Sequence, residues 1–290
     1  MLEITGVSHT YANGTQALSD VNLSIPRGMY GLLGPNGAGK STLMRAIATL
    51  QVPSSGSIRF GDMDVLAEPE AVRRRLGYLP QDFGVYPRVS AYQMLDHMAV
   101  LKGIPGGERK AVVETLLNQT NLWAARNKAI AGFSGGMRQR FGIAQALIGN
   151  PDLIIVDEPT AGLDPEERNR FLNLLAGIGE SVVVILSTHI VDDVADLCPR
   201  MAVLAGGKVQ LEGAPATLIE QTNGRVWKKT IARDALEAHS AQQQVISTRL
   251  FAGSTIIHIL ADAPPPGFEP VNAGLEDVYF TTLADLRRAA

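Results

Sequence analysis

The residues best suited to chemistry lie in a glycine-rich stretch near the start of the chain. Residues 31–42 read GLLGPNGAGKST, and residues 34–41 fit the spacing G-x-x-x-x-G-K-[ST]. Glycines let the backbone turn so sharply that several N–H groups converge on one anion, and a following helix adds its positive dipole end. The lysine would reach phosphate oxygens and the hydroxyl a magnesium ion. The stretch predicts a nucleotide phosphate site formed by Gly34, Pro35, Asn36, Gly37, Ala38, Gly39, Lys40, Ser41 and Thr42.

Two acidic residues follow an apolar run in the segment PDLIIVDEPTAGLD, residues 151–164. An apolar run without alternation is typical of a strand buried on both faces of a parallel sheet, and ligands bind beyond the carboxyl ends of such strands. Asp157 is therefore predicted to hold Mg²⁺, and Glu158 to accept a proton from an attacking water. The alternative is a pair of solvated loop acids, which the phosphate motif in the same chain disfavours.

Positioning these groups requires a strand, a loop and a helix in that order. MYGLL at 29–33 predicts a buried strand, and STLMRAIATL at 41–50 has apolar residues at helical spacing. Alternation near the start predicts strands of an antiparallel edge sheet, at 2–11 and 17–25. Residues 82–150 predict a mostly helical subdomain, after which the chain returns to the core. Together these patterns predict an α/β fold, with a P-loop NTPase core built on a mostly parallel sheet with flanking helices.

The pattern changes after EGAPATLIEQTNG, residues 212–224. Three short strand-like runs and two helical runs follow, separated by a proline-rich loop; they are the segments 226–231, 244–250, 254–260, 233–241 and 274–289. We therefore expect a larger nucleotide-binding domain at residues 1–216 and a small C-terminal α/β accessory domain at residues 217–290.

Composition narrows the classes of partner. The 290 residues carry 26 basic and 29 acidic side chains, so the formal net charge is −3 and no basic footprint for nucleic acid is expected. Cys198 is the single cysteine, which excludes an intramolecular disulfide and fits a reducing compartment. The longest apolar runs, at 153–156 and 182–186, fall far short of the roughly 20 residues that span a bilayer. We expect a cytoplasmic protein that reaches a membrane only through a partner.

Residues 133–140 read FSGGMRQR and, together with the two motifs above, make the chain resemble the ATP-binding subunits of ABC transporters over roughly residues 1–216. The resemblance implies binding of ATP and Mg²⁺. It implies further roles at matching positions: adenine stacking by Tyr11, Mg²⁺ binding and sensing by Gln81, a dimer-interface loop at Asp164, and γ-phosphate contact by His189. It also implies that Lys40, Gln81, Glu158 and His189 form the catalytic set. A packed tyrosine at a strand end is the alternative for Tyr11.

A second glycine-rich helix start, at Ser134, Gly135 and Gly136, would bind a further anion. In the family this second site faces the nucleotide held by another subunit. The resemblance therefore implies a homodimer that sandwiches two ATP molecules, with poor hydrolysis by a monomer.

Two features resemble the subset of the family that serves exporters of drugs, antibiotics, polysaccharides or ions. One is Met137 followed by Arg138, in a motif where Phe133 replaces the family's usual leucine and Met137 its usual glutamine. The other is LEDVYFTTL at 275–283. This similarity implies a separate multi-span permease, with the chain on the inner face of the cell membrane. Phe83, Val85 and Tyr86 lie where the family receives the permease, although they could instead fold back onto the core. Import, and a soluble role on ribosomes or DNA, remain alternatives. A nucleotide-gated switch with little turnover is disfavoured by Glu158 and His189.

Overall fold

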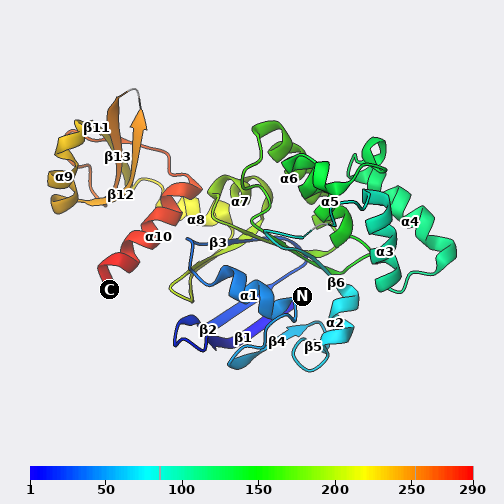
Figure 1. Cartoon of the computed structure of the whole chain (residues 1–290). Helices are drawn as coiled ribbons and strands as arrows, with labels where there is room; N and C mark the ends of the chain where they lie inside the picture. Colours follow the sequence, from blue (N-terminus) through cyan, green and yellow to red (C-terminus); the bar gives the residue numbers. More distant parts are fainter. Residues whose placement is uncertain (85, 252, 290) are drawn as a thin grey trace.

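The computed structural model describes residues 1–84, 86–251 and 253–289 (Figure 1). Its strands are β1 Leu2–Thr10, β2 Gln16–Ile25, β3 Gly28–Leu33, β4 Ser55–Phe60, β5 Met63–Asp64, β6 Leu76–Leu79, β7 Leu153–Asp157, β8 Val183–Thr188, β9 Arg200–Ala205, β10 Lys208–Gly213, β11 Val226–Ile231, β12 Gln244–Phe251, β13 Ser254–Leu260 and β14 Glu269–Pro270. Its α-helices are α1 Lys40–Ile47, α2 Pro69–Arg75, α3 Ala91–Leu101, α4 Gly106–Gln119, α5 Gly135–Ala146, α6 Pro165–Gly179, α7 Val191–Leu197, α8 Pro215–Thr222, α9 Leu236–Gln242 and α10 Leu275–Ala289. Short 3₁₀ turns are η1 Trp123–Ala125, η2 Ile130–Gly132 and η3 Arg233–Ala235.

The central sheet has the strand order β10-β9-β3-β8-β7-β6, with every neighbouring pair parallel except β10 and β9. All residues of β7 and β8 are buried, as the unalternating apolar runs predicted. Alternate residues of β3 serve two apolar layers: Tyr30 and Leu32 face one core, whereas Met29 and Leu33 face another. The sheet is therefore covered on both sides, and its carboxyl edge is left to bind ligands.

The first layer holds α1 between the central sheet and a four-stranded sheet of order β2-β1-β4-β5 (Figure 1). Leu2 pairs with both Ile25 and Phe60, which fixes the register of β1 against β2 and β4. The helix predicted for 41–50 begins one residue earlier, at Lys40, and ends at Ile47. Thr49, with φ of +61°, turns the chain out of the helix.

Helices α3, α4 and α5 form the helical subdomain around their own apolar core, on the right of Figure 1. Ser90 starts α3 with a capping box, accepting from the Gln93 amide while the Gln93 side chain accepts from Ser90. Phe133 is buried in this core, edge-on to Phe141, and Met137 packs against it. Phe133 and Met137, which differ from the family's usual residues, thus both contact the apolar core of the helical subdomain.

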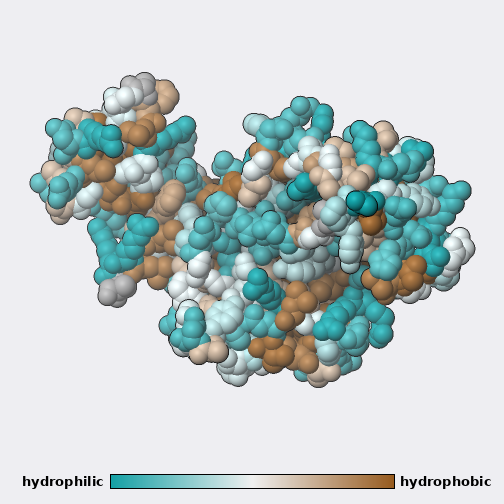
Figure 2. All heavy atoms as spheres, viewed as in Figure 1, coloured by the Kyte–Doolittle hydropathy of each residue, from teal (hydrophilic) through white to brown (hydrophobic). Residues whose placement is uncertain are grey.

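The C-terminal part of the chain from β11 to α10, here called the appendix, contains a sheet of order β12-β13-β11-β14. Helices α9 and α10 flank this sheet (Figure 1). The segment predicted as one helix at 233–241 is split into η3 and α9. Figure 2 shows the appendix as a lobe set beside the main body, with polar and apolar side chains mixed on its visible face.

The last helix does not stay within that lobe. Leu275, Val278 and Tyr279 of α10 belong to the same apolar core as Val194 of α7 and Val203 of β9. The boundary predicted between residues 216 and 217 falls inside α8, against which α10 also packs. The division into two domains stays a prediction.

Across the described residues, no helix combines the length and the apolar character required to cross a bilayer.

Candidate active site

The carboxyl ends of four parallel strands bring the glycine loop, Gln81, Glu158 and His189 to one cavity, whereas Asp157 is not among the residues that line it. The loop 34–39 follows β3, Gln81 follows β6, Glu158 follows β7 and His189 follows β8. The cavity has a volume of about 410 Å³. It is lined by Tyr11, Thr15, Gln16, Ala17, Pro35, Asn36, Gly37, Ala38, Gly39, Lys40, Ser41, Thr42, Gln81, Glu158 and His189.

The glycine loop forms a cradle at the start of α1. Gly39 occupies the N-cap position with φ of +104° and has no side chain to cap the first amides of α1, which have no partner within the helix. A Cβ on Gly39 would lie 2.4 Å from the Ala17 carbonyl oxygen, and one on Gly34 would lie 2.2 Å from the Leu204 carbonyl oxygen. Side chains are excluded at both positions, which leaves backbone N–H groups to face an anion.

Lys40 is buried beneath this cradle. Its Nζ donates to the carbonyl oxygens of Gly34, at 2.5 Å, and Pro35, at 3.3 Å. The same nitrogen lies 3.3 Å from Oε1 of Glu158. The ammonium group therefore already stands between the loop and the carboxylate predicted to act as the base.

Glu158 is held on its other side by His189. The His189 Nδ1 lies 2.6 Å from Oε2 of Glu158, and an ionised carboxylate requires the ring nitrogen to donate. Glu158 is buried and adopts φ of +50°, while its amide donates to the Ser187 carbonyl at 2.8 Å. Left-handed backbone is uncommon for a non-glycine residue and persists only where the surroundings enforce it.

Asp157 lies at the end of β7, almost fully buried. Burial raises the pKa of its carboxyl group, and the neighbouring hydroxyls of Ser187 and Ser41 act in the opposite direction. Within the described part of the chain, Oδ1 of Asp157 has no hydrogen-bond partner. This free oxygen, the Ser41 hydroxyl and the Gln81 amide oxygen are the hard donors that Mg²⁺ prefers, so the residues fit the ion.

Tyr11 lies at the rim, where its hydroxyl exchanges a hydrogen bond of 2.9 Å with the Thr42 hydroxyl. Its ring packs edge-on against His9, at 4.8 Å between centroids. Thr15, Gln16 and Ala17 also line the cavity but are absent from the sequence-based set. Their place where the chain turns back from Tyr11 into β2 is the signal that would have included them.

The second glycine-rich helix start and the predicted dimer-interface loop do not line this cavity; their residues are Ser134, Gly135, Gly136 and Asp164. Ser134 caps α5 by accepting from the Met137 amide at 3.3 Å, and Asp164 caps α6 by accepting from the Glu167 amide at 2.9 Å. Gly135 is the first residue of α5. A Cβ on Gly136 would lie 2.3 Å from Oε2 of Glu167, so glycine there allows α5 and α6 to approach.

In the segment predicted to contact a permease, Phe83 and Tyr86 differ in their exposure to solvent. Phe83 packs between the main core and the helical subdomain, 6.4 Å from the Phe141 ring. Tyr86, in contrast, is 64% exposed. Val85 lies outside the described residues. Folding back onto the core therefore applies to Phe83, and Tyr86 is available for contact.

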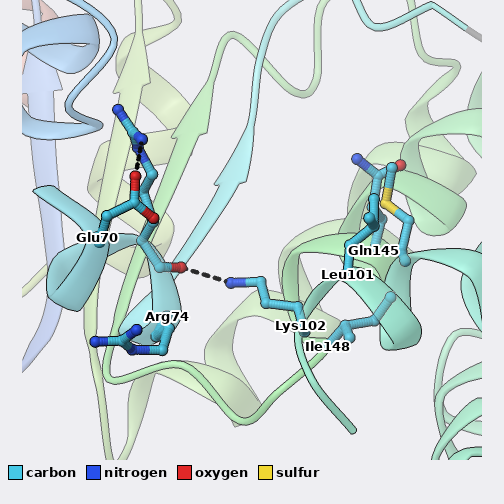
Figure 3. A pocket seen from close by; sticks show the side chains of 8 residues that line it. Glu70, Arg74, Leu101, Lys102, Gln145 and Ile148 are labelled. Carbon is cyan, nitrogen blue, oxygen red and sulfur yellow. Dashed lines mark hydrogen bonds and ion pairs between the residues drawn. The ribbon is translucent and has the colours of Figure 1, made fainter.

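A separate cavity of about 350 Å³ lies between α2, α3 and the end of α5 (Figure 3). Lys102 crosses it and donates, at 2.8 Å each, to the carbonyl oxygens of Arg73 and Leu76, where α2 ends. Burial lowers the pKa of Lys102. The side chain thus ties the helical subdomain to the core away from the nucleotide cradle.

Comparison with known proteins identifies what the chain resembles. A family model described as ABC transporter matches residues 18–161. The daunorubicin/doxorubicin resistance ATP-binding protein DrrA of Streptomyces peucetius is 34% identical over 266 residues, covering 91% of this chain and 78% of that protein. The methionine import ATP-binding protein MetN of Caulobacter vibrioides is 40% identical over 222 residues, covering 74% and 67%.

A solved structure agrees with these matches. It is a dimeric ATP-binding cassette in a post-hydrolysis state with ADP and Pi bound, 28% identical in sequence. Its superposition gives a TM-score of 0.68 and covers 74% of this chain and 98% of that chain.

Proposed function

The chain belongs to the ABC transporter family, and on that premise we propose that it powers export of a solute through a separate membrane permease. The chain is an ATPase subunit of an ABC transporter, and the direction of transport is the part that we propose. Export is supported by Met137 and Arg138 after the second glycine motif, by the segment 275–283, and by similarity to a drug-resistance ATP-binding protein. Import is the second candidate, because a methionine import protein is 40% identical.

The main observation in support of the hydrolytic mechanism is that Lys40 and His189 both contact the Glu158 carboxylate, next to the glycine cradle. The phosphates of ATP, as substrate, would lie against the free amides of the loop and the first turn of α1. Lys40 would exchange the Gly34 and Pro35 carbonyls for phosphate oxygens, which are stronger, charged acceptors.

Glu158 would take the proton from the water that attacks the γ-phosphate. A general base of this kind contributes about 10²- to 10⁴-fold in rate. His189, which donates to Glu158 through Nδ1, would orient that carboxylate and offer its other ring nitrogen to the γ-phosphate. Ser41, Asp157 and Gln81 would hold Mg²⁺, which supplies charge stabilisation to the β- and γ-phosphate oxygens.

Adenine would stack on Tyr11 at the rim of the cavity, and the γ-phosphate end would be closed by a second copy of the chain. Ser134, Gly135, Gly136 and Asp164 lie outside the cavity of their own subunit, so an isologous dimer would supply them from the partner. A dimeric relative supports this arrangement. Charge supplied in trans is worth roughly 10³- to 10⁵-fold in other P-loop enzymes, so a monomer would turn over slowly.

The permease would contact the region around the exposed Tyr86, near the junction of the core and the helical subdomain. The chain would then lie at the inner face of the membrane, held there by that contact. ATP-driven closure of the dimer would move the Gln81 segment and the permease together, and hydrolysis would reopen the dimer.

The test begins by purifying the tagged chain from its native membranes in mild detergent and identifying the proteins that accompany it by mass spectrometry. A stoichiometric multi-span membrane protein is expected, and Tyr86→Ala should reduce its recovery, whereas Tyr92→Ala serves as the aromatic control. Ribosomal or DNA-processing proteins without a membrane protein would contradict the transport proposal.

Direction is tested on the recovered complex in lipid vesicles. A solute that stimulates ATP hydrolysis from the same side as the ATPase indicates export, because an exporter loads its solute on the side where ATP is consumed. Stimulation only from the opposite side would replace export with import.

A further inference from the structure

Besides Asp157 and Glu158, a further buried carboxylate lies close in the chain to His189, and the mechanism above does not use it. Asp193, the third residue of α7, has no solvent-exposed surface. Its Oδ2 accepts a hydrogen bond from the Thr160 hydroxyl, and its Oδ1 accepts from Nε of Arg168 at 2.7 Å. Both oxygens are therefore satisfied, as a buried charge requires.

The three residues of this network come from three segments, two of which carry the cavity residues Glu158 and His189. Thr160 follows Glu158 by two residues, and it is itself buried. Asp193 follows His189 by four residues. Arg168 lies in the first turns of α6, whose cap is Asp164. The Asp193 carboxylate thus connects three segments through hydrogen bonds: the segment after β7, the segment after β8 and the start of α6.

The contact between Glu158 and His189 requires that the segments after β7 and β8 keep a fixed position relative to each other. Their side chains project from the ends of different strands, and the His189 side chain is 48% exposed, so packing alone does not hold it. Glu158 also keeps a left-handed backbone conformation that must be enforced from outside. A displacement of about 1 Å in a catalytic group can cost about 10²-fold in rate.

We propose that Asp193 is a positioning residue for ATP hydrolysis, which acts through Thr160 and Arg168 to hold Glu158 and His189 in register. The proposal rests on the hydrolytic function proposed above. It also explains why a buried charge is kept there, since well-packed apolar residues often replace a buried ion pair without loss of stability.

The test compares two substitutions of the same residue. Thr160→Val keeps the side-chain volume but removes the donor to Asp193, and Thr160→Ser keeps the donor. We expect Thr160→Val to lower kcat between about 10- and 100-fold, with KM for ATP and the equilibrium affinity for ATP within about twofold of the original chain. Thr160→Ser should retain most of kcat. Asp193→Asn provides an independent change at the other end of the hydrogen bond and should also lower kcat.

A double substitution separates positioning from stability. In a His189→Ala background, Thr160→Val should lower kcat much less than it does alone, because the contact that it positions is already gone. An unchanged kcat in Thr160→Val, or an equal loss in both backgrounds, would overturn the proposal. The turnover of the unsubstituted chain is measured first: its absence would refute the proposed hydrolytic function itself, whereas turnover without the Thr160 effect refutes only the role of Asp193.

Discussion

Nδ1 of His189 lies 2.6 Å from Oε2 of Glu158, while Nζ of Lys40 lies 3.3 Å from the other carboxylate oxygen. The glutamate is therefore held between a cation that belongs to the phosphate cradle and an imidazole from the neighbouring strand. Phosphate arriving at Lys40 would draw that cation away and leave Glu158 paired with His189 alone. Under the proposed mechanism, substrate binding at Lys40 and activation of Glu158 as the base would thus be linked through one side chain.

Glu158→Gln removes the proton acceptor but keeps the shape of the side chain. We expect ATP hydrolysis to fall about 10²- to 10⁴-fold while ATP binding is retained, and we expect ATP to trap a dimer. Phosphate release measures the first effect, and size-exclusion chromatography with ATP measures the second. Glu220→Gln, an exposed change on α8, is the control. Hydrolysis at the original rate in Glu158→Gln would remove Glu158 from the role of base.

Lys40→Ala removes the ammonium group that contacts the cradle carbonyls. Hydrogen bonds to charged groups are worth about 1.5–3 kcal/mol, so the affinity for ATP should fall roughly 10- to 150-fold. Equilibrium titration with a fluorescent ATP analogue measures the change, and Lys110→Ala on the exposed side of α4 is the control. An unchanged affinity would contradict the assignment of the cradle.

Gly37 and Gly39 both have positive φ, of +79° and +104°, but their surroundings differ. No atom lies within 4 Å of a Cβ placed on Gly37, whereas one on Gly39 would meet the Ala17 backbone. Gly37→Ala should cost only the conformational strain of about 1–2 kcal/mol, and Gly39→Ala should cost a further 1–3 kcal/mol or so from overpacking. Urea unfolding without nucleotide measures both. Equal unfolding free energies of the two variants would show that the Ala17 backbone moves away from the added Cβ at no measurable cost.

Burial, with a smaller contribution from the charge of Asp193, raises the pKa of the Cys198 thiol to about 12. Because the folded value lies above the unfolded one, this group stabilises the fold at neutral pH, and that stabilisation is lost as the pH rises toward 12. We expect almost no reaction with iodoacetamide at pH 8 in the native chain, and one label per chain in urea, measured by mass spectrometry. Equal labelling rates with and without urea would show that the thiol is exposed.

The local parts of the site could be predicted from the sequence because each is encoded over a few residues. The spacing from Gly34 to Ser41 specifies a loop and helix start, and the apolar run before Asp157 specifies a buried strand with its carboxyl end at the ligand edge. Parallel strands then bring these ends together, which is why Lys40, Glu158 and His189 meet in one cavity.

The contacts between distant segments could not be predicted in the same way. Asp192 and Asp193 are adjacent and alike in sequence, and only the rotation of α7 buries Asp193 against Thr160 and Arg168. The periodicity of residues 274–289 indicated a helix but gave no sign that it packs on α7 as well as on the appendix sheet. Both outcomes depend on tertiary packing, which local pattern does not record.

The return of α10 to the core has a consequence for the order in which the chain is made. The side chains of β9 that Leu275, Val278 and Tyr279 cover are synthesised about 70 residues before those three. At roughly 5–20 residues per second, that interval lasts about 4–14 seconds on the ribosome. During this time the apolar surface around Val194 and Val203 stays open. The nascent ATPase would therefore be a client for chaperones that shield apolar surface until its last helix emerges.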